Sequence, residues 1–433
     1  MKNPFGVNPQ VLALALARMS ESVGNSFLIV VLPLFISSEF VTGNTFGLTE
    51  VAITGIILSL FGFVNSPLQP FTGRLSDRTG RRKIFVLFGL VLIATASFSY
   101  SLAGTYWHLI GLRVLQGIAG AFIIPTTVAL VNDLAEEGNR GGNMGTYNTF
   151  RLVGFGTGPI AAGGVVGAGP YTLPLVDVTI TGFDAAFYFA ALTASLALVL
   201  VFILIRDPDI ETREVETTDS GGISVFDQSG EQLLDPVFTL GVISFFMAVG
   251  IAVFATLGDI VNTKLDQGPQ MFGLQFSAFV LAQILLQAPI GRATDFYGRR
   301  VFILFGTILL VPTTLVQGII PSTTLLWGVI PNPWLMFFAR FFQGAAGAMV
   351  FAPALALAGD LAPEDRSGST LSVLTMAFGF GVAFGPLLSG FLVELGFVVP
   401  FAFAAFLAAL GVVLALTQVE EVITPQRTIP FVG

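Results

Sequence analysis

The sequence predicts an all-α, polytopic membrane protein with twelve transmembrane helices arranged as two pseudo-symmetric six-helix bundles. Three observations predict this class: an apolar composition, twelve long apolar stretches and an internal repeat. Hydrophobic residues make up 54% of the 433 residues, charged residues make up 11%, and the mean hydropathy is +0.84. Soluble domains carry about 25% charged residues. The chain has too little charge to cover a surface in water, so we expect much of its apolar surface to face lipid.

Twelve stretches of the chain are long and apolar enough to cross a membrane as helices. A spanning helix needs roughly 20 mainly apolar residues, since each residue rises about 1.5 Å and the hydrocarbon is about 30 Å thick. Strands of a membrane barrel would instead alternate apolar and polar residues. The stretches cover residues 11–36, 48–71, 84–103, 106–131, 144–167, 183–205, 237–257, 272–290, 301–320, 333–358, 369–394 and 397–417. The first of them is too long for a cleaved signal peptide.

The positively charged residues orient these helices. If the N-terminus lies in the cytoplasm, fourteen of the nineteen lysines and arginines lie on the cytoplasmic side, and only Lys264 lies outside. The remaining four, Arg18, Arg113, Arg151 and Arg340, lie within the predicted helices. Cytoplasmic loops of membrane proteins carry an excess of Lys and Arg. We therefore expect a multi-pass protein of the plasma membrane with both termini in the cytoplasm.

The composition also excludes several kinds of functional site. The chain has no cysteine and a single histidine, His108, so disulfides, thiolate metal sites and histidine-rich metal sites are excluded. The net charge of −8 argues against binding to nucleic acid, which needs basic patches. No P-loop with its Gly-Lys-Ser/Thr ending is present, so ATP hydrolysis is not the expected energy source. We predict no catalytic residues, no bound metal and no cofactor.

Two sets of motifs show that the second half of the chain repeats the first. The segment Gly73–Arg82 (GRLSDRTGRR) recurs 218 residues later as Gly291–Arg300 (GRATDFYGRR). A second set recurs 227 residues later: Trp107, Arg113, Gln116-Gly117, Asp133 and Gly158-Pro159 return as Trp334, Arg340, Gln343-Gly344, Asp360 and Gly385-Pro386. Paired matches at constant spacing indicate a duplication. The difference between the two spacings indicates an insertion near residues 321–333.

The repeat predicts the domain organisation. Both copies of each motif fall on the same side of the membrane, so the halves are expected to run in parallel about an axis along the membrane normal. We expect an N-terminal six-helix bundle over residues 1–205 and a C-terminal one over 236–418. Between them, the acidic segment 206–235 has the composition of a flexible cytoplasmic linker. Residues 419–433 form a cytoplasmic tail.

These motifs resemble those of the major facilitator superfamily, and the likeness covers nearly the whole chain. Gly73 to Lys83 resembles the family's loop between helices 2 and 3, and Arg113-x-x-Gln-Gly resembles its helix 4 signature. Gly145, Gly154 and Gly158-Pro159 resemble the helix 5 signature of the twelve-helix drug/proton antiporter branch. That signature usually ends Gly-Pro-x-x-Gly-Gly, whereas residues 162–163 are Ala-Gly here. The resemblance implies a transporter and favours an exporter.

The resemblance also implies a gate on the cytoplasmic side. In the family, the loop between helices 2 and 3 latches this gate against the start of helix 11, which lies near Ser367–Thr370 here. Asp77 suits this role, because an acid near a helix N-terminus gains about 0.3–1 kcal/mol from the helix dipole. A plain positive-inside anchor is the alternative. The candidate gate residues are Gly73, Asp77, Arg78, Gly80, Arg81, Arg82, Gly291, Asp295, Gly298 and Arg299.

Glycine and proline residues in helices 5 and 11 are candidates for a hinge or for a close contact between helices of one half. Small residues four apart let two helix backbones approach each other, and proline bends a helix. Ordinary helix packing is the alternative and does not exclude the first reading. The candidates are Gly154, Gly158, Pro159, Gly381, Gly385 and Pro386.

Charges predicted inside the membrane are the candidates for proton or substrate coupling. A charge at mid-bilayer costs at least about 2.5–3.5 kcal/mol, so it needs a partner or a function. Glu21 lies about ten residues into its helix, roughly 15 Å deep, where it can exchange a proton with each side in turn. Arg18 lies on the same helix face, and a structural Arg18–Glu21 pair is the alternative. The candidates are Glu21, Arg18, Arg113, Arg151 and Arg340.

The other buried arginines and four amides have two interpretations each. The family counterpart of Arg113 faces the central cavity, and Arg340 is its repeat mate; snorkelling to the outer interface is the alternative for both. Arg151 is expected to pair with Asp133 or with Glu21. The candidate residues of the substrate cavity are Asn25, Gln116, Asn148 and Gln343, which alternatively hold helices together.

The leading interpretation is a secondary active transporter that couples the export of small lipophilic compounds to protons by alternating access. An importer or facilitator of a metabolite, such as a sugar or an organic anion, is the alternative, and the buried arginines favour an anion. A membrane-embedded enzyme would need clustered acids, histidines or metal ligands, and a non-transporting sensor would carry an added soluble domain. The expected partners are a small-molecule substrate, protons and the lipid bilayer, with the protein as a monomer that binds no nucleic acid.

Overall fold

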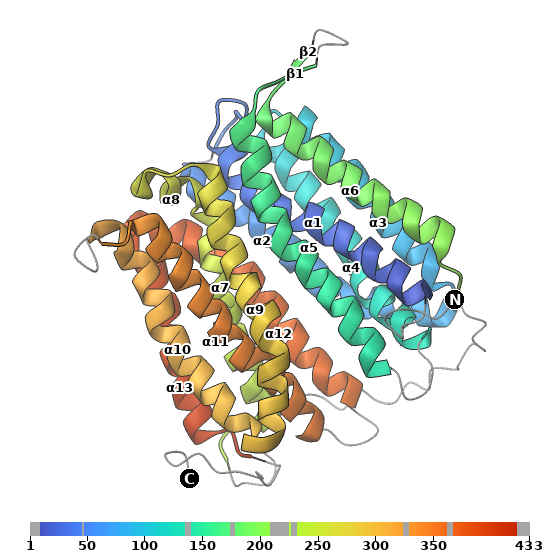
Figure 1. Cartoon of the computed structure of the whole chain (residues 1–433), viewed down its shortest axis with the longest axis vertical. Helices are drawn as coiled ribbons and strands as arrows, with labels where there is room; N and C mark the ends of the chain where they lie inside the picture. The colour runs from blue at the N-terminus through green and yellow to red at the C-terminus, as the bar shows by residue number, and fades with distance from the viewer. Residues whose placement is uncertain are drawn as a thin grey trace. The chain divides into compact units, whose positions relative to one another are not determined.

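The computed structural model describes residues 9–45, 47–134, 140–173, 178–207, 225–226, 232–323, 329–361 and 367–421. Twelve long helices and one short helix make up most of these residues (Figure 1). The structure divides into two compact units, Met1–Asp219 with Gln267–Ser277, and Ser220–Asp266 with Ala278–Gly433. Most of the linker and of the C-terminal tail predicted from the sequence lies outside the described residues, so the predicted domain boundaries stay predictions.

The first half contains six long helices and a small hairpin. These elements are α1 (Pro9–Ile36), α2 (Glu50–Thr79), α3 (Arg82–Ser99), η1 (Tyr100–Leu102), α4 (Tyr106–Asp133), α5 (Arg140–Ala168), β1 (Tyr171–Leu173), β2 (Val178–Ile180) and α6 (Gly182–Leu204). Helix α1 packs against α5 and α6, while α3 packs against α4 and α6. The two strands pair antiparallel, with Thr172 opposite Thr179.

The second half repeats this arrangement. Its elements are α7 (Pro236–Thr256), α8 (Gly258–Leu265), α9 (Pro269–Tyr297), α10 (Arg299–Ile319), η2 (Ile320–Ser322), α11 (Asn332–Leu361), α12 (Ser367–Leu392), η4 (Val393–Leu395) and α13 (Val398–Thr417). Helix α7 packs against α12 and α13, while α10 packs against α11 and α13. Each of these pairs corresponds to a pair in the first half, because α7, α10, α11, α12 and α13 are the repeats of α1, α3, α4, α5 and α6.

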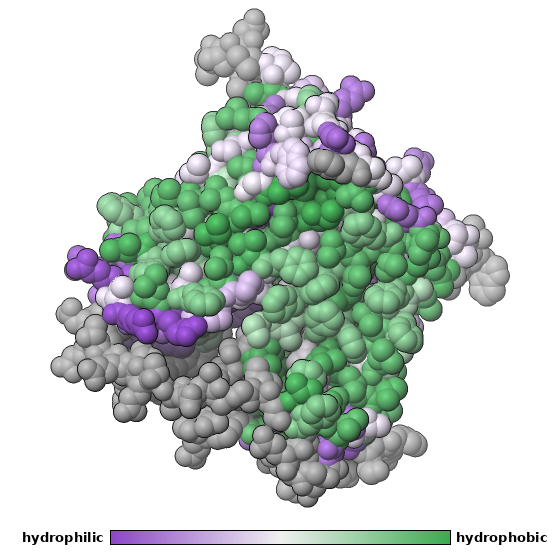
Figure 2. All heavy atoms as spheres, turned by 180° about the vertical axis from the view of Figure 1, so that it is seen from behind, coloured by the Kyte–Doolittle hydropathy of each residue, from purple (hydrophilic) through white to green (hydrophobic). Residues whose placement is uncertain are grey.

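The prediction of an all-α, polytopic membrane protein is confirmed. Among the described helices, eleven are long and apolar enough to cross a membrane. Helix α5 is the twelfth predicted span; it has 29 residues, but its many glycines, threonines and asparagines make it less apolar. Large apolar side chains, such as Leu192, Phe202 and Phe406, lie exposed on the outer faces of helices. Apolar residues dominate the face shown in Figure 2.

Two segments that we expected to be loops are helical. The repeated Gly73 motif was predicted to form a loop, but α2 continues to Thr79 and α9 continues to Tyr297. Gly80 ends α2 in the left-handed conformation, with φ 64°, and its N–H donates to the carbonyl of Ser76. The last turns of both helices carry charged residues, so we expect them to lie beyond the hydrocarbon. A chain that stays helical there keeps its backbone hydrogen bonds as it leaves the membrane. The segment after α7, which lies between two predicted spans, also forms a helix, α8.

Candidate functional site

The buried carboxylate of Glu21 and the guanidinium of Arg18 form an ion pair in the middle of α1. The distance between Arg18 Nη1 and Glu21 Oε2 is 2.5 Å, and the Glu21 side chain is 4% exposed. Their spacing of three residues places both side chains on one face of the helix. Glu21 lies twelve residues after Pro9, which is roughly 18 Å along the helix axis. The ion pair that we gave as the alternative to proton coupling is therefore present, near the middle of the helix, where an unpaired charge within a membrane would be costly.

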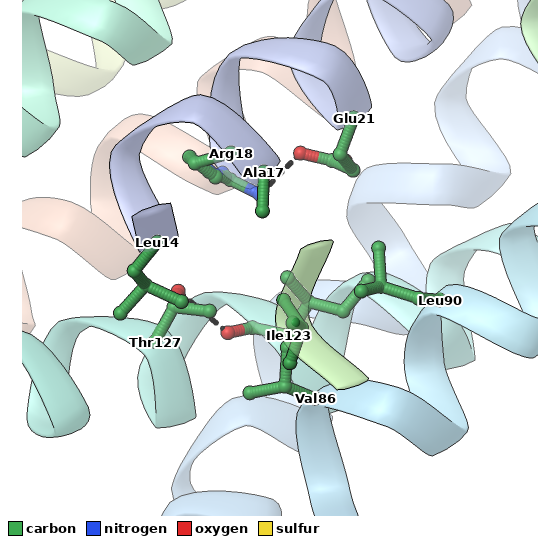
Figure 3. Close-up of a pocket in the computed structure, with 9 residues that line it drawn as sticks. Leu14, Ala17, Arg18, Glu21, Val86, Leu90, Ile123 and Thr127 are labelled. Carbon is green, nitrogen blue, oxygen red and sulfur yellow. Dashed lines mark hydrogen bonds and ion pairs between the residues drawn. The ribbon is translucent and has the colours of Figure 1, made fainter. Parts of the chain in front are cut away.

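The pair borders a small pocket inside the first half (Figure 3). Four helices line it: α1 contributes Leu14 and Ala17 beside the pair, and α3, α4 and α6 contribute the remaining residues. These are Val86, Leu90, Ile123, Thr127 and Val201. Apart from the ion pair, the hydroxyl of Thr127 is the one polar side-chain group in this lining. An apolar wall of this kind strengthens the electrostatic interactions of the pair, because the local dielectric constant is low.

Helix α5 supplies the remaining polar groups near the pair. The hydroxyls of Tyr147 and Thr127 are hydrogen bonded at 2.6 Å, and both side chains are buried. Tyr147 interacts electrostatically with both Arg18 and Arg151, and the charges of Arg18 and Glu21 also act on Arg151. The sequence analysis missed Tyr147 and Thr127 because neither is charged and neither belongs to a repeated motif.

One predicted pairing is wrong. Arg151 was expected to pair with Asp133 or Glu21, but its Nε donates to Oδ1 of Asn148 at 3.0 Å, one turn earlier in α5. Asp133 instead pairs with Arg82 at the end of α4, and Glu21 pairs with Arg18. Arg151 therefore lies close enough to Glu21 for their charges to interact, but the two form no ion pair among the described residues. Asn148, a candidate cavity residue, orients Arg151, whereas Asn25 lies half-buried in α1.

The candidate hinge glycines form close contacts between helices of one half. A Cβ atom added at Gly154 would overlap the backbone of Met19, and one added at Gly158 would overlap Ser26 and the carbonyl of Val23. In the second half, Cβ atoms at Gly381 and Gly385 would meet the carbonyls of Phe245 and Val249. Glycine is required at these positions because the backbones of two helices touch there.

The prolines beside these glycines also lie at helix contacts. Pro159 packs against Gly273, at the start of α9, within the first unit. The carbonyl of Pro386 accepts a hydrogen bond from Thr256 of α7 at 3.3 Å, and Ser389 donates to the carbonyl of Val253 at 3.0 Å. The contact predicted within one half is thus present for the four glycines and for Pro386, whereas Pro159 contacts α9, a helix of the second half. A hinge motion at these positions stays a prediction.

The glycine contacts show which residues of α7 correspond to the ion pair. In the first half, Met19 and Val23 of α1 contact the glycines of α5; in the second half, Phe245 and Val249 of α7 contact the corresponding glycines of α12. Residues of α1 therefore correspond to residues of α7 that lie 226 positions later. With this shift, Arg18 corresponds to Ser244 and Glu21 corresponds to Met247. Helix α5 maps onto α12 with the shift of 227 residues found in the sequence, so Tyr147 corresponds to Leu374 and Arg151 to Phe378. The second half has no acid at the position of Glu21.

A buried arginine–glutamine pair is common to both halves. Arg113 Nη1 donates to Gln116 Oε1 at 3.0 Å, and Arg340 Nη1 donates to Gln343 Oε1 at 2.5 Å. Arg113 and Arg340 are 3% and 0% exposed, so neither snorkels to the membrane surface as the alternative interpretation required. Instead, each guanidinium lies 5.1 Å from the centre of a phenyl ring, Phe61 for Arg113 and Phe279 for Arg340, an attractive cation–π geometry.

The amide groups of these two glutamines bind neighbouring helices. Gln116 Oε1 also accepts a hydrogen bond from the hydroxyl of Tyr100 at 3.1 Å. Gln343 Nε2 donates to the carbonyl of Gly250 at 3.1 Å and to Thr314 at 3.0 Å. Both side chains therefore hold helices together, which is the alternative that we considered for them; binding of a substrate by Gln116 or Gln343 stays a prediction.

The candidate gate residues form charge networks at the predicted cytoplasmic ends of the helices. Arg82 bridges Asp77 at 3.1 Å and Asp133 at 2.5 Å. In the second half, Arg299 pairs with Asp360. The remaining charged gate candidates, Arg78, Arg81 and Asp295, are exposed. Gly73 and Gly291 lie in the last turns of α2 and α9, and the side chains of Ser367–Thr370 lie outside the described set, so the predicted latch stays a prediction.

A second polar contact follows the last helix of each half, and the sequence analysis missed it. Asp207 accepts a hydrogen bond from the backbone N–H of Lys83 at 2.7 Å, and Lys83 Nζ donates to the carbonyl of Phe202 at 2.8 Å. Glu421 accepts from the N–H of Arg300 at 2.8 Å, and Arg300 donates to the carbonyl of Leu416 at 3.0 Å. We call these two arrangements the clasps. Each carboxylate caps a helix N-terminus, where the dipole favours a negative charge.

The clasps correct the register of the repeat. The sequence motif aligned Arg82 with Arg300, 218 residues apart, but the contacts align Arg82 with Arg299 and Lys83 with Arg300. The second copy is one residue shorter, because α10 begins directly after Gly298 whereas Arg81 separates Gly80 from α3. Gly298 adopts φ 87° and approaches Glu421 so closely that a Cβ atom would meet its carboxylate.

Comparison with curated proteins identifies relatives along nearly the whole chain. Multidrug resistance protein 2 of Bacillus subtilis is 26% identical over 408 residues, which cover 92% of each chain. Quinolone resistance protein NorA of Staphylococcus aureus is 22% identical over 431 residues, which cover 96% of this chain and 98% of the relative. The similarity is low but extends over both halves.

Solved structures share the fold. The nucleoside transporter NupG, in a mutant form, matches with a TM-score of 0.71 at 13% identity and covers 94% of this chain and 98% of its own. A bacterial homologue of the human lysosomal transporter Spinster, inward-facing and occupied, matches with a TM-score of 0.66 at 14% identity over 94% of each chain.

The family model described as the Major Facilitator Superfamily matches this chain twice. The two matches cover residues 14–260 and 238–430, and together they span both halves of the repeat. This family consists of membrane transporters, so the prediction of a transporter rather than an enzyme is confirmed. The chain belongs to the Major Facilitator Superfamily.

Proposed function

We propose that this transporter exports small lipophilic compounds from the cell in exchange for protons, as a monomer in the plasma membrane with both termini in the cytoplasm. The names of the two relatives, a multidrug and a quinolone resistance protein, support export of such compounds. The observation that carries proton coupling is the buried Glu21–Arg18 pair in the middle of a membrane helix. A carboxylate there is costly unless it is paired or functional.

In this proposal, Glu21 carries the proton. Arginine keeps its charge throughout, since it does not deprotonate in proteins, so the pair changes its net charge only through Glu21. When Glu21 binds a proton, the carboxylate no longer neutralises Arg18, and the charge balance within the first half changes by one unit. A conformational equilibrium responds to such a change if one state stabilises the charge better than the other. Arg113, Arg151 and Arg340 are proposed to set this balance.

The gate and the glycine contacts have distinct proposed roles. The Arg82 and Arg299 networks are proposed to form part of the gate at the cytoplasmic ends. The contacts of Gly154 and Gly381 join α5 to α1 and α12 to α7 within each half. Such backbone contacts are proposed to let each bundle move as one body during alternating access.

A second candidate function is uptake of a polar or anionic metabolite. Among the described residues, the first half contains three buried or half-buried arginines in the interior of its long helices, Arg18, Arg113 and Arg151, but one acid there, Glu21. This excess of positive charge favours an anion. The solved nucleoside transporter has the same fold but is too distant in sequence to decide the substrate.

A flux assay in proteoliposomes tests proton-coupled export. An imposed pH gradient is expected to drive transport of ethidium, a lipophilic cation, against its concentration gradient. Glu21→Gln is expected to lower this flux at least about tenfold while the protein remains folded. Glu50→Gln, which neutralises an exposed acid at the start of α2, is the matched control and is expected to retain the flux. Unchanged flux in Glu21→Gln would remove Glu21 from the role, and gradient-driven uptake of an organic anion in place of ethidium would favour the second function.

A further inference from the structure

The position of acidic residues in the helices limits how many protons the transporter can carry. Among the described residues, Glu21 is the one carboxylate that lies in the interior of a long helix. Every other described acid lies in the first or last turn of a helix, in a short helix, or outside the helices. Examples are Glu50 and Asp184 at helix starts, and Asp133 and Asp360 at helix ends. The single histidine, His108, is exposed near the start of α4.

The second half does not provide a second proton carrier at the matching position. The contacts of Gly154 and Gly381 place Met247 at the position that corresponds to Glu21. Met247 is 2% exposed, and Leu374 and Phe378 replace Tyr147 and Arg151. A thioether does not bind a proton at physiological pH, and neither does any of these apolar side chains. Within the part of the chain that the structure describes, only the first half thus has a carboxylate in the middle of a long helix.

Among the groups around Glu21, Glu21 itself is the one suited to change its charge during transport. Arg18 comes from α1, and Tyr147 and Arg151 come from α5. Thr127 is the polar group from α4, whereas α3 and α6 contribute only apolar residues to the pocket. Arginine stays protonated in proteins, and the hydroxyls of Tyr147 and Thr127 are hydrogen bonded to each other, so Glu21 is the group suited to exchange a proton in each cycle.

We propose that each transport cycle exchanges one substrate molecule for one proton, carried by Glu21. This inference rests on the proposed proton-coupled export. With one proton entering, export of a neutral compound moves one positive charge inward, and export of a monocation moves no net charge. Export of a dication moves one positive charge outward, against a membrane potential that is negative inside. The substrates that the protein can export against a concentration gradient are therefore neutral compounds and singly charged cations.

The stoichiometry fixes the size of the gradients. A potential of about 59 mV corresponds to a tenfold ratio for one charge. At a pH difference of one unit and a potential of about −60 mV, one proton supports a gradient of about 100-fold for a neutral compound, about tenfold for a monocation and none for a dication. Two protons would support about 1,000-fold for a monocation and about 100-fold for a dication under the same conditions.

Proteoliposomes with a potassium diffusion potential set by valinomycin test this inference. At a fixed pH difference, the steady ethidium gradient, corrected with protein-free vesicles, is expected to stay the same between 0 and about −60 mV, and the dication methyl viologen is not expected to accumulate at about −60 mV. A roughly tenfold rise of the ethidium gradient over this range, or accumulation of methyl viologen, would overturn one-proton coupling while leaving proton-coupled export intact.

Two variants separate failure of the stoichiometry from failure of the proposed function. Glu21→Asp retains a carboxylate, and its ethidium gradient is expected to remain independent of the potential even if its rate falls. Glu21→Gln is expected to lose the response to the pH gradient. If ethidium flux ignores the pH gradient in the unmodified protein, or if Glu21→Gln still responds to it, the proposed function or the role of Glu21 fails, and the one-proton inference fails with it.

Discussion

The two halves of the molecule share a scaffold but differ in the charge that it holds. In both, glycines of one helix touch the backbone of another, an arginine–glutamine pair is buried, and an acid after the last helix caps a helix N-terminus. Among the described residues, only the first half places an acid in mid-helix, where Glu21 pairs with Arg18; the second half has Met247 and Ser244 there. Helix packing places the same constraints on both copies, whereas a single proton-binding group is enough for the proposed coupling. The difference between the halves therefore assigns the proposed coupling to the first half.

The largest expected effect comes from placing the same side chain at the two corresponding positions. Glu21→Gln is expected to abolish the response of transport to a pH gradient, because an amide does not bind a proton at neutral pH. Met247→Gln introduces the same amide at the corresponding position of α7, and the response is expected to persist. Ethidium flux at several pH gradients measures both variants. Loss of the response in Met247→Gln, with the protein folded, would show that the second half also takes part in coupling.

Substitution of the contact glycines is expected to destabilise both halves. Gly154→Ala and Gly381→Ala insert a methyl group where two helix backbones touch, at a cost of about 1–3 kcal/mol or more. Gly145→Ala is the matched control in α5, because an added Cβ meets nothing within 4 Å there. Thermal unfolding in detergent measures the three variants. Equal stability of Gly154→Ala and Gly145→Ala would contradict the close contact with Met19.

Removal of the glutamine from each arginine–glutamine pair tests whether the two pairs are equivalent. Gln116→Leu and Gln343→Leu each remove one acceptor of a buried guanidinium, at an expected cost of about 1.5–3 kcal/mol. The loss is expected to be larger for Gln343, because its amide also donates to the carbonyl of Gly250 and to Thr314. Unfolding in detergent measures the difference, and Thr314→Val serves as a control that removes a single neutral bond. A smaller loss for Gln343→Leu than for Thr314→Val would contradict the bonding described here.

The smallest expected effect concerns the clasps. Asp207→Asn and Glu421→Gln remove a negative charge from the N-termini of α3 and α10, where such a charge contributes about 0.3–1 kcal/mol. Both variants are expected to lower the unfolding temperature slightly and by similar amounts, and more so at low salt. Glu420→Gln, which neutralises the exposed neighbouring acid, is expected to have no effect. A loss in only one half would show that the two clasps are not equivalent.

The sequence predicted the features that depend on repeated motifs. Gly154, Gly158, Gly381 and Gly385 were recognisable because close helix contacts restrict these positions to small residues in both copies. The two Arg-x-x-Gln motifs were recognisable because they recur in both copies, but the hydrogen bond within each motif was not predicted. The sequence also does not distinguish an arginine that snorkels from one that lies against a phenyl ring. The Arg18–Glu21 pair, which we considered as the alternative to a coupling role, followed from the spacing of the two residues along a single helix.

The features that the sequence did not predict depend on contacts between distant segments. The bond between Tyr147 and Thr127 joins two helices through neutral side chains that carry no pattern. Asp207 lies in the acidic linker, whose composition indicated only solvation, and Glu421 lies in the predicted C-terminal tail. An acid a few residues after the last helix of each half was nevertheless an available signal. The one-residue difference between Gly80–Arg82 and Gly298–Arg299 was hidden by the double arginine in both copies.

Counting the protons released when a substrate cation binds tests the role of Glu21 most directly. Ethidium is added to the purified protein in weakly buffered detergent solution, and a pH indicator records the protons released per protein. The unmodified protein is expected to release at most one proton, Met247→Gln is expected to release the same number, and Glu21→Gln is expected to release none. Release that persists in Glu21→Gln, or that clearly exceeds one proton in the unmodified protein, would contradict a single coupling group in the first half.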